Sequence, residues 1–326
     1  MKIAIYGAGA IGAHLGGMLT RSGVDVSLIA RGPHLEAMQQ NGLLCKFQDG
    51  EEFRVHPNAT DDPASLGPQD YVIVTLKAHQ SPGVVGLMQP LMGPDTAVVT
   101  AMNGVPWWYF YGLGSDHDGT HLKAVDPGRA QWDGLGPERA IGMVVHPATE
   151  ITAPGVMQHM EGDAYPIGEP SGEKTPRIEA LSAALTESGL RAPIRTKIRD
   201  DIWMKLWGNL CLNPVSALTG STLGGLGQNE AVRDLLFGLA AEGRAVGEAL
   251  GARFRVTAER RLKAAFEIGD HKTSMLQDLE RGRPMEIDAL VTSVTELGDV
   301  VGVDTPLLDA VAALVKLKAR NAGLYG

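Results

Sequence analysis

Three polar residues in the second half of the chain recur at a spacing that a helix would bring to one face. Lys205, Asn209 and Asn213 are each four residues apart, and mainly apolar residues stand between them. Residues four apart share one face of an α-helix. A narrow polar stripe on an apolar helix is typical of a cleft wall or of a buried polar network, and both interpretations stay open.

Two further polar groups follow downstream. Ser274 opens the run Ser274–Asp278, and Glu286 begins an otherwise apolar stretch that continues to Val301. The simplest interpretation of Glu286 is an acid in the first turn of a helix, where it complements the helix dipole. From the sequence alone this structural interpretation is favoured.

A glycine-rich segment near the N-terminus has the pattern G-x-G-x-x-G. It follows the apolar run Lys2–Tyr6 and leads into the helical spacing of Ile11–Ser22, which is the context that a dinucleotide-binding loop requires. The first glycine permits the tight turn, the second lets a pyrophosphate approach the backbone, and the third lets the helix pack closely. The alternative is an ordinary glycine-rich turn. The residues of the segment are Gly7, Ala8, Gly9, Ala10, Ile11 and Gly12.

The residue that ends the second predicted strand favours one cofactor. An NAD site normally carries Asp or Glu there, whereas this chain has Arg31 after the strand Val24–Ala30. A guanidinium can bind a 2′-phosphate through two parallel hydrogen bonds, and a carboxylate would repel it. The sequence therefore predicts NADP(H), unless Arg31 is only a solvated loop residue.

Two more polar residues follow predicted strands. Lys77 comes directly after Tyr71–Leu76, and Asn103 comes shortly after Thr96–Thr100. The carboxyl ends of parallel strands lie at one edge of the sheet, where ligands bind. Either could be merely a polar strand end, but their shared position favours a role facing the cofactor.

The elements that must position these residues fall into two classes. Short apolar runs alternate with helical patterns in the first half, which predicts a doubly wound parallel sheet, with a hairpin at Asp49-Gly50. From about residue 198 helix-forming residues prevail. We therefore predict an α/β fold: an N-terminal Rossmann-type NADP-binding domain, residues 1–195, and a C-terminal all-helical domain for substrate and dimerisation, residues 196–326.

Residues 106–137 interrupt this pattern. The segment opens with the aromatic run Trp107–Tyr111 and then becomes polar and rich in Gly and Asp. Long insertions of this kind are uncommon in compact domains and often form lids or contact surfaces. We expect such a role here, close to the residue Asn103.

Composition excludes several classes of protein. The chain has 326 residues, with 29 Lys+Arg against 38 Asp+Glu, a net charge of −9 that argues against nucleic acid as a partner. No stretch approaches the roughly 18–20 apolar residues that span a bilayer, so we expect no membrane partner and a cytoplasmic location. Cys45 and Cys211 have no metal or redox spacing. His117 and His121 have no third ligand in view, so no metal is expected.

Taken together, the residues resemble the 2-dehydropantoate 2-reductase family, also called ketopantoate reductases. The resemblance covers essentially the whole length and implies NADPH-dependent reduction of a 2-oxo acid, ketopantoate to pantoate, in the route to pantothenate and coenzyme A. Its motifs, in order, are Gly7–Gly12, Arg31, Leu76-Lys77-Ala78, Asn103-Gly104, the Lys205/Asn209/Asn213 helix, Ser274–Asp278 and Glu286-Ile287-Asp288.

The resemblance also implies residue roles. Lys205 would donate the proton, and Glu286 would assist at the same site and contact the cofactor. Asn103 would lie between cofactor and substrate. The substrate would be bound by Asn209, Asn213 and Ser274.

Alternatives remain open. Another NADP-dependent 2-oxo-acid or β-hydroxyacid dehydrogenase would share the spacing of Lys205 and Asn209, and the segment 106–137, longer than the family leads one to expect, could alter the accepted acid. A non-catalytic NADP sensor would bind cofactor without turnover, against which the pair Lys205/Glu286 argues. Since twofold dimers are the commonest assemblies, a homodimer is expected.

Overall fold

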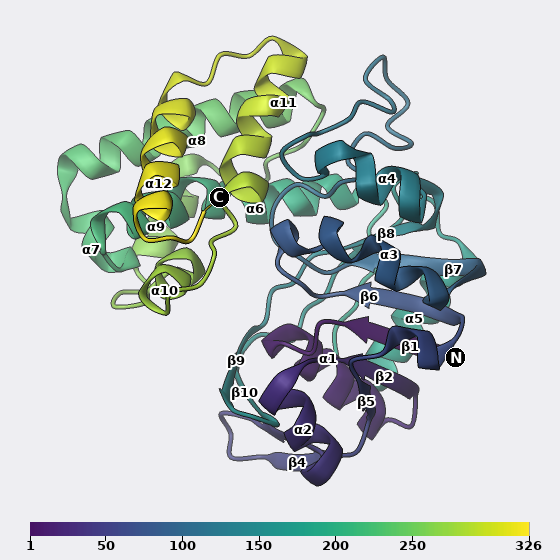
Figure 1. The fold of residues 1–326 in the computed structure, drawn as a ribbon. Helices are drawn as coiled ribbons and strands as arrows, with labels where there is room; N and C mark the ends of the chain where they lie inside the picture. Colours follow the sequence, from purple (N-terminus) through teal and green to yellow (C-terminus); the bar gives the residue numbers. More distant parts are fainter. Residues whose placement is uncertain (326) are drawn as a thin grey trace. The chain divides into compact units, whose positions relative to one another are not determined.

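The computed structural model describes residues 1–325, which form two compact units (Figure 1). The first unit comprises residues 1–102, 108–120 and 128–198, and the second comprises 103–107, 121–127 and the chain from Arg199 onward. The sequence predicted one boundary, between 195 and 196. In the structure the chain passes between the units several times, because two short segments near the predicted insertion group with the helical unit.

The first unit is built on a seven-stranded sheet with the order β11-β8-β7-β6-β1-β2-β5, parallel except for β11. Ile3 of β1 lies beside Val26 of β2 on one side and beside Tyr71 of β6 on the other. The strand order reverses direction between β1 and β6, so the fold is the predicted doubly wound type, and the prediction of an α/β fold is confirmed. The strands are β1 (Lys2–Tyr6), β2 (Asp25–Ile29), β5 (Asn58–Thr60), β6 (Gln69–Val74), β7 (Met92–Thr100), β8 (Ala140–Met143) and β11 (Ile167–Gly168).

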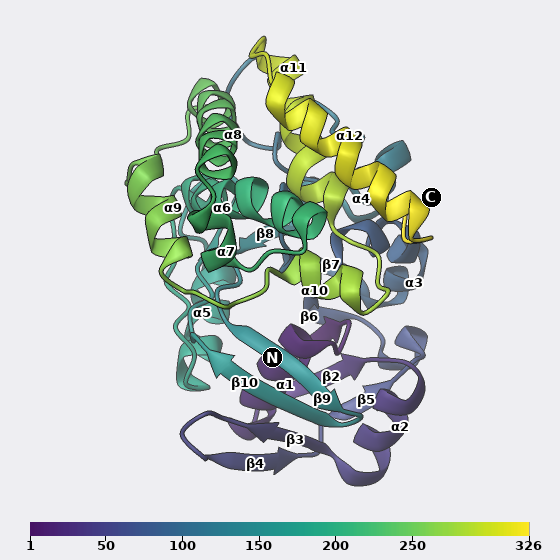
Figure 2. The same ribbon diagram turned by 90° about the vertical axis from the view of Figure 1, so that its left-hand side faces the viewer.

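A second, four-stranded sheet has the order β4-β3-β10-β9 and is seen clearly in Figure 2. Its strands β3 (Leu43–Lys46) and β4 (Glu52–Val55) form the hairpin predicted around Asp49-Gly50. The strand β10 (Val156–Glu161) pairs in parallel with β3 and antiparallel with β9 (Ala148–Ala153).

Helix α1 (Ala10–Arg21) packs between the two sheets, in contact with β2 on one side and with β3, β9 and β10 on the other. Two glycines make this possible. A Cβ atom on Gly16 would overlap Leu28 of β2, and one on Gly17 would overlap Cys45 of β3. The helix that starts at the glycine-rich loop is therefore held on both sides, and this fixes the direction in which its N-terminus points.

The core of the first unit joins one face of the large sheet to α1 and α5 (Pro176–Glu187). Ile3 and Ile5 of the sheet, Leu15 and Leu19 of α1, and Leu181 of α5 belong to one fully buried cluster. The other helices are α2 (Gly32–Asn41), α3 (Val85–Met88) and α4 (Ala130–Leu135), with short 3₁₀ turns at Pro63–Leu66, Ala78–Gln80, Pro82–Val84, Gln89–Leu91, Pro127–Arg129 and Pro137–Arg139.

The aromatic run after β7 is buried. Trp108, Tyr109 and Phe110 are at most 1% exposed, and the Trp108 indole N–H donates to Thr100 Oγ1 at 2.9 Å. Trp108 also lies against Gly142 of β8, where a Cβ atom would collide with its ring. Our expectation of a lid or contact surface is wrong for these three side chains, since they belong to the core.

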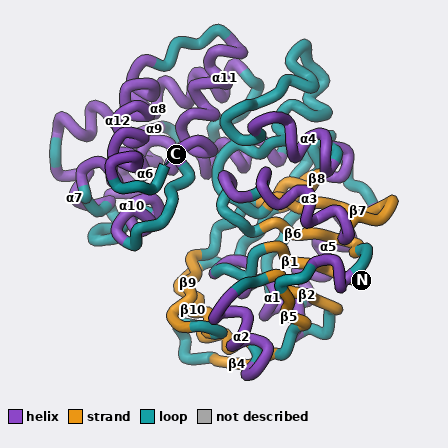
Figure 3. The backbone as a smooth tube through the Cα atoms, in the orientation of Figure 1, coloured by secondary structure: helices purple, strands orange, loops and turns teal. Residues whose placement is uncertain are grey.

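The second unit is helical, whereas every strand within residues 1–325 lies in the first (Figure 3). Trp203 and Trp207 of α6 are buried against Phe254, and the Trp207 indole N–H donates to the carbonyl of Ala240 in α8 at 2.8 Å. The elements are α6 (Ile198–Thr219), α7 (Leu223–Gln228), α8 (Glu230–Ala249), α9 (Ala258–Phe266), α10 (Ser274–Glu280), a π-helical turn (Asp288–Thr292), α11 (Ser293–Val301) and α12 (Pro306–Asn321). No helix of residues 1–325 is long and apolar enough to cross a membrane.

Candidate active site

In the second unit, a lysine, an asparagine and a glutamate form a continuous hydrogen-bonded chain. Lys205 Nζ donates to Asn103 Oδ1 at 2.6 Å, and Asn103 Nδ2 donates to Glu286 Oε2 at 3.1 Å. An ammonium can only donate and a carboxylate can only accept, so the two charges fix the orientation of the amide between them. The Glu286 side chain is buried, with 5% exposure for the residue. The arrangement holds a cation and an anion together through one neutral amide.

Helix α6 presents Lys205 because its other side is occupied. The two tryptophans on either side of Lys205 in the sequence, Trp203 and Trp207, are buried and in contact with Phe254. These aromatic contacts and the bond from Trp207 to α8 set the rotation of α6 about its axis. Lys205 is left only half-buried, on a different side of the helix.

The polar stripe continues along α6. Asn213 is 5% exposed, and its Nδ2 lies 3.5 Å from Ser274 Oγ at the start of α10, which is a long and weak hydrogen bond. Asn209 is half-buried, and its side chain has no hydrogen-bond partner among residues 1–325. Its amide, one turn from Lys205, is therefore available to a ligand.

The two acids of the Glu286-Ile287-Asp288 motif do different things. Asp288 accepts hydrogen bonds from Thr292 and Tyr325 and forms an ion pair with Lys316 of α12 at 3.0 Å. Glu286 instead accepts from Asn103, while its backbone carbonyl accepts from the N–H of Leu290 at 3.2 Å. Asp288 thus fastens this turn to α12. The Glu286 carboxylate is not the solvated first-turn acid that the sequence favoured.

In the first unit, the glycine-rich loop is held between the ends of β2 and β6. The N–H groups of Gly7 and Ala8 both donate to the carbonyl of Ile29, at 3.1 and 3.0 Å, and Thr75 Oγ1 donates to the carbonyl of Gly7 at 2.5 Å. Gly7 has φ of 107°, which favours glycine. A Cβ atom on Gly12 would collide with the carbonyl of Gly7. The loop lies beside the β1–β6 reversal point, where such sheets bind ligands.

Gly9 leaves the start of α1 open. No atom lies within 4 Å of the position that a Cβ atom on Gly9 would take, and no side chain caps the helix. The first N–H groups of a helix have no partner within it, and with the helix dipole they favour an anion. Ala8 is buried, while Ala10 and Ile11 are half-buried. This open cradle of backbone fits the pyrophosphate of a dinucleotide.

Arg31 and Lys77 also follow strands at the carboxyl edge of the large sheet. Arg31 is exposed and precedes α2, and it acts on the Tyr6 hydroxyl: burial raises the pKa of Tyr6, and the Arg31 charge partly opposes this. Lys77 is half-buried, and its carbonyl accepts from the N–H of Gln80 at 2.8 Å. No acidic residue stands beside Arg31 in the sequence, while Asp61 and Asp62 follow the neighbouring strand β5.

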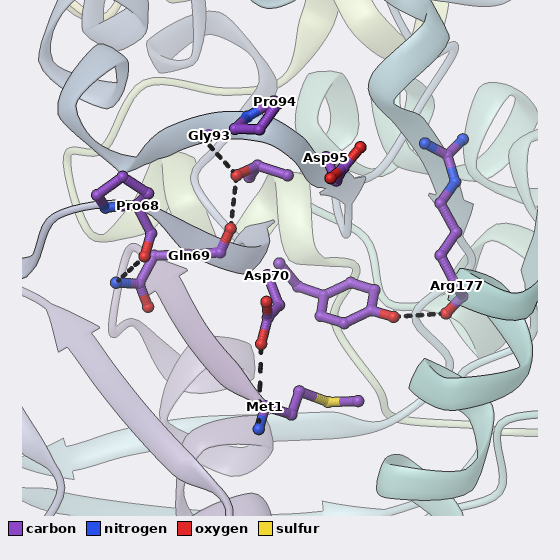
Figure 4. A pocket seen from close by; sticks show the side chains of 10 residues that line it. Met1, Pro68, Gln69, Asp70, Gly93, Pro94, Asp95 and Arg177 are labelled. Carbon is purple, nitrogen blue, oxygen red and sulfur yellow. Dashed lines mark hydrogen bonds and ion pairs between the residues drawn. The ribbon is translucent and has the colours of Figure 1, made fainter.

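A hollow of about 380 Å³ opens at the opposite edge of the sheet, where β6 and β7 begin (Figure 4). Two of its charged groups, Asp70 and Arg177, are engaged in other contacts. The Asp70 carboxylate accepts from the backbone N–H of Lys2 at 2.7 Å, and the Arg177 guanidinium is bound to Glu169 at 2.6 Å. Ligands of doubly wound sheets bind at the carboxyl edge, so this hollow is not the cofactor site.

Metal-binding clusters are absent from residues 1–325, which hold no group of three or more His, Cys, Asp or Glu residues placed for an ion. His121 contacts the backbone carbonyl of Asp126, and His117 lies against Phe110. Cys45 and Cys211 are buried free thiols.

A Rossmann-type sheet with a glycine-rich loop, together with a helical unit that carries a lysine and a carboxylate, defines an NAD(P)-dependent oxidoreductase of two units. The family follows from comparison with known proteins. Residues 3–172 match the family described as "Ketopantoate reductase PanE/ApbA", and residues 197–319 match its C-terminal counterpart. The chain belongs to the ketopantoate reductase family.

Similar proteins extend over the full length. A 2-dehydropantoate 2-reductase of Mesorhizobium japonicum is 52% identical over 326 residues, which is 100% of both chains. The solved structure of a candidate ketopantoate reductase from Ralstonia solanacearum MolK2 covers 99% of each chain, with a TM-score of 0.94 and 40% identity. A D-mandelate dehydrogenase solved with NADH and anilino(oxo)acetate covers 99% of this chain and 100% of its own, with a TM-score of 0.81. At 23% identity it shares the fold.

Two contacts of the site were not found from the sequence. Thr75, which binds the carbonyl of Gly7, follows β6 directly, and its position at a strand end was the available signal. The carbonyl of Ala289, which accepts from the N–H of Val105, has no side-chain signal at all. Such a backbone contact becomes visible only in the folded chain.

The open space at Gly9 predicts a change that harms cofactor binding but not folding. In Gly9→Val, whose backbone has φ of −68°, we expect the affinity for NADPH and NADH to fall by more than about tenfold, because the side chain fills the place of the pyrophosphate. The melting temperature without cofactor should change by no more than about 2 °C.

The matched control is Gly86→Val in α3, where a Cβ atom also meets nothing within 4 Å. Fluorescence titration and thermal melting of both variants provide the measurement. Unchanged cofactor affinity in Gly9→Val would contradict the assignment of this loop.

Proposed function

We propose that this protein reduces 2-dehydropantoate (ketopantoate) to pantoate with NADPH, as a step of pantothenate and coenzyme A synthesis. The observation that carries the proposal is the chain of hydrogen bonds from Lys205 through Asn103 to Glu286. It provides a positioned proton donor next to a buried carboxylate. The 52% identical relative, named a 2-dehydropantoate 2-reductase, supports this choice of substrate.

Reduction of a ketone requires two different contributions. A bound nicotinamide cofactor supplies the hydride for the carbonyl carbon. As negative charge develops on the carbonyl oxygen, Lys205 Nζ stabilises it as a cation and gives it the proton. A positioned acid of this kind contributes about 10²- to 10⁴-fold in rate. Asn103 Oδ1 accepts a hydrogen bond from Nζ, which favours the protonated lysine before the transfer.

Glu286 has a supporting role in this scheme. Its carboxylate accepts from Asn103 Nδ2 and so holds the amide with Oδ1 turned towards Lys205. We also assign to it the cofactor contact that the family resemblance implies. Because Glu286 is negatively charged, the carboxylate of a 2-oxo acid needs donors elsewhere.

Those donors are available along α6. Asn209 and Asn213 lie one and two turns from Lys205, and Ser274 lies beside Asn213. We assign all three to substrate binding. Amide and hydroxyl groups suit the carboxylate and the hydroxyl group of ketopantoate, because they can donate and accept hydrogen bonds.

The cofactor is assigned to the first unit. The loop Gly7–Gly12 would hold the pyrophosphate, Arg31 the 2′-phosphate, and Lys77 a position at the same edge. Asn103 follows the end of β7 by three residues in the chain, which ties the amide covalently to the strand that leads to this edge. We therefore divide the tasks between an NADP-binding first unit and a substrate-binding second unit.

We further propose a cytoplasmic homodimer formed through the helical unit. Three leucines on α12 are 38–56% exposed, at positions 307, 314 and 317. Their spacing puts them along one side of the helix. An exposed apolar stripe of this kind favours association with another copy.

The Arg31 guanidinium should determine the choice between the two cofactors. In the unmodified protein NADPH should bind at least about tenfold more tightly than NADH, and Arg31→Ala should remove this difference by weakening NADPH alone. Fluorescence titration of both cofactors gives the affinities. Arg21→Ala, at the far end of α1 and paired with Glu51, serves as the control for loss of a surface arginine. Equal affinities before the substitution would contradict the assignment.

The reaction is tested by the decrease of NADPH absorbance at 340 nm with ketopantoate and with a panel of other 2-oxo acids. We expect ketopantoate to have the highest kcat/KM, and Lys205→Met to lower kcat by about 10²- to 10⁴-fold while NADPH affinity is kept.

Lys263→Met, at an exposed position on α9, should leave kcat unchanged. If another 2-oxo acid had a higher kcat/KM than ketopantoate, the proposed substrate would be wrong, while the proposed reduction of a 2-oxo acid would stand. Cofactor binding without any turnover would overturn the proposed reaction. Near-normal kcat in Lys205→Met would overturn the assigned proton donor.

A further inference from the structure

The loop that carries Asn103 is bound to one backbone carbonyl of the helical unit. The N–H of Val105 donates to the carbonyl of Ala289 at 3.0 Å. The same oxygen accepts from Ser293 Oγ at 2.8 Å, and Ser293 is fully buried. The Ala289 carbonyl thus joins the loop to the helix. It accepts hydrogen bonds from both the Val105 N–H and the Ser293 hydroxyl.

Gly104 makes the close approach possible. It has φ of 91°, which favours glycine, and a Cβ atom there would collide with the Ala289 carbonyl oxygen and lie 2.6 Å from its carbon and 2.7 Å from the Ala289 Cβ. Any other residue at 104 would push the loop away from the helix. The neighbouring residue that would move first is Asn103.

The carbonyl belongs to an unusual part of the helix. Residues Asp288–Thr292 form a π-helical turn, in which the N–H of Ser293 bonds to the carbonyl of Asp288 five residues earlier. Such turns are rare and are frequent at functional sites, because the wider spiral redirects backbone groups. This turn begins two residues after Glu286, and Asp288 is anchored to α12 through Lys316. One short stretch therefore carries both Glu286 and the carbonyl that holds the asparagine loop.

We propose that Gly104 and Ser293 are positioning residues, which act through the Ala289 carbonyl to hold the Asn103 amide between Lys205 and Glu286. The proposal rests on the proposed function, since it concerns the proton donor of that reaction. The two hydrogen bonds of the Asn103 side-chain amide have donor–acceptor distances of 2.6 and 3.1 Å. A shift of the amide by about 1 Å would therefore break at least one of them. Neither residue needs to touch the substrate.

The first test compares two glycines with positive φ. Gly104→Ala introduces backbone strain and the collision with Ala289. Gly302→Ala, at the end of α11 with φ of 69° and no neighbour within 4 Å, introduces strain alone. We expect Gly104→Ala to lower kcat by about 10- to 100-fold. The alkaline limb of its kcat/KM profile should move to lower pH, because Nζ loses the acceptor that favours its charged form. Gly302→Ala should leave both kcat and the pH profile of kcat/KM unchanged.

The second test removes a hydroxyl without adding an atom. Ser293→Ala deletes the bond to the Ala289 carbonyl, and we expect kcat to fall by about 2- to 10-fold. Thr295→Ala is the control on the same helix, because Thr295 Oγ1 bonds at 3.0 Å to the carbonyl of Thr292, which does not hold the loop. Ser293→Ala also tests the proposal if Gly104→Ala fails to fold.

A readout without turnover separates this proposal from the proposed function. Lysines labelled by reductive ¹³C-methylation can be followed by NMR, and the Lys205 signal is the one missing in Lys205→Met. Its titration should shift to lower pH in Gly104→Ala and stay in place in Gly302→Ala. Absence of turnover in the unmodified protein would defeat the proposed function while this shift still tested the contact. Titration and kcat that match between the two glycine variants would overturn the positioning role.

Discussion

The candidate site depends on one neutral amide held between two opposite charges. Asn103 accepts a hydrogen bond from Lys205 and donates one to Glu286, so both charges favour the same orientation of the amide. A direct ion pair would place the ammonium against the carboxylate itself. The intervening amide keeps the two charged groups apart and links them through two hydrogen bonds. The buried tryptophans of α6 and the π-helical turn before α11 both support this geometry.

The two units solve different parts of the problem. In the first unit, the candidate cofactor site is formed mainly by backbone groups: Gly9 leaves the helix start open, and Gly7 and Thr75 hold the loop against its strands. In the second unit, the site is formed by side chains, and buried aromatic contacts fix the rotation of helix α6, which carries Lys205. The segments 103–107 and 121–127 belong to the helical unit although they interrupt the sheet unit in sequence. Asn103, which bonds to the proton donor, thus belongs to the helical unit, although in the sequence it follows strand β7 of the sheet unit.

Local patterns predicted much of this structure. The strands of the large sheet, the hairpin at Asp49-Gly50 and the long helices follow from apolar runs and helical spacing, which depend on neighbours in sequence. Helix α5 was overlooked, although Thr175 and Pro176 gave a helix start signal. The strands β5 and β9 were also not predicted, because they carry polar residues and lack an apolar run.

The tertiary contacts could not be predicted in the same way. Asn103 and Glu286 are 183 residues apart, so nothing local to Glu286 distinguishes it from a solvated first-turn acid. The π-helical turn and the Ala289 carbonyl are backbone features without a sequence signature. The burial of Trp108 was missed because an aromatic run beside a polar insertion looks like a contact surface until its neighbours are known.

Lys205, Asn103 and Glu286 should act as a unit, and a double-mutant cycle on kcat tests this most directly. The variants are Asn103→Ala, Glu286→Gln and the two combined, each with its NADPH affinity measured alongside. If Glu286 acts by orienting Asn103, the double variant should be no slower than the slower single variant, because the second substitution removes a partner that is already lost. Losses that multiply would show independent roles and would contradict the bridged site.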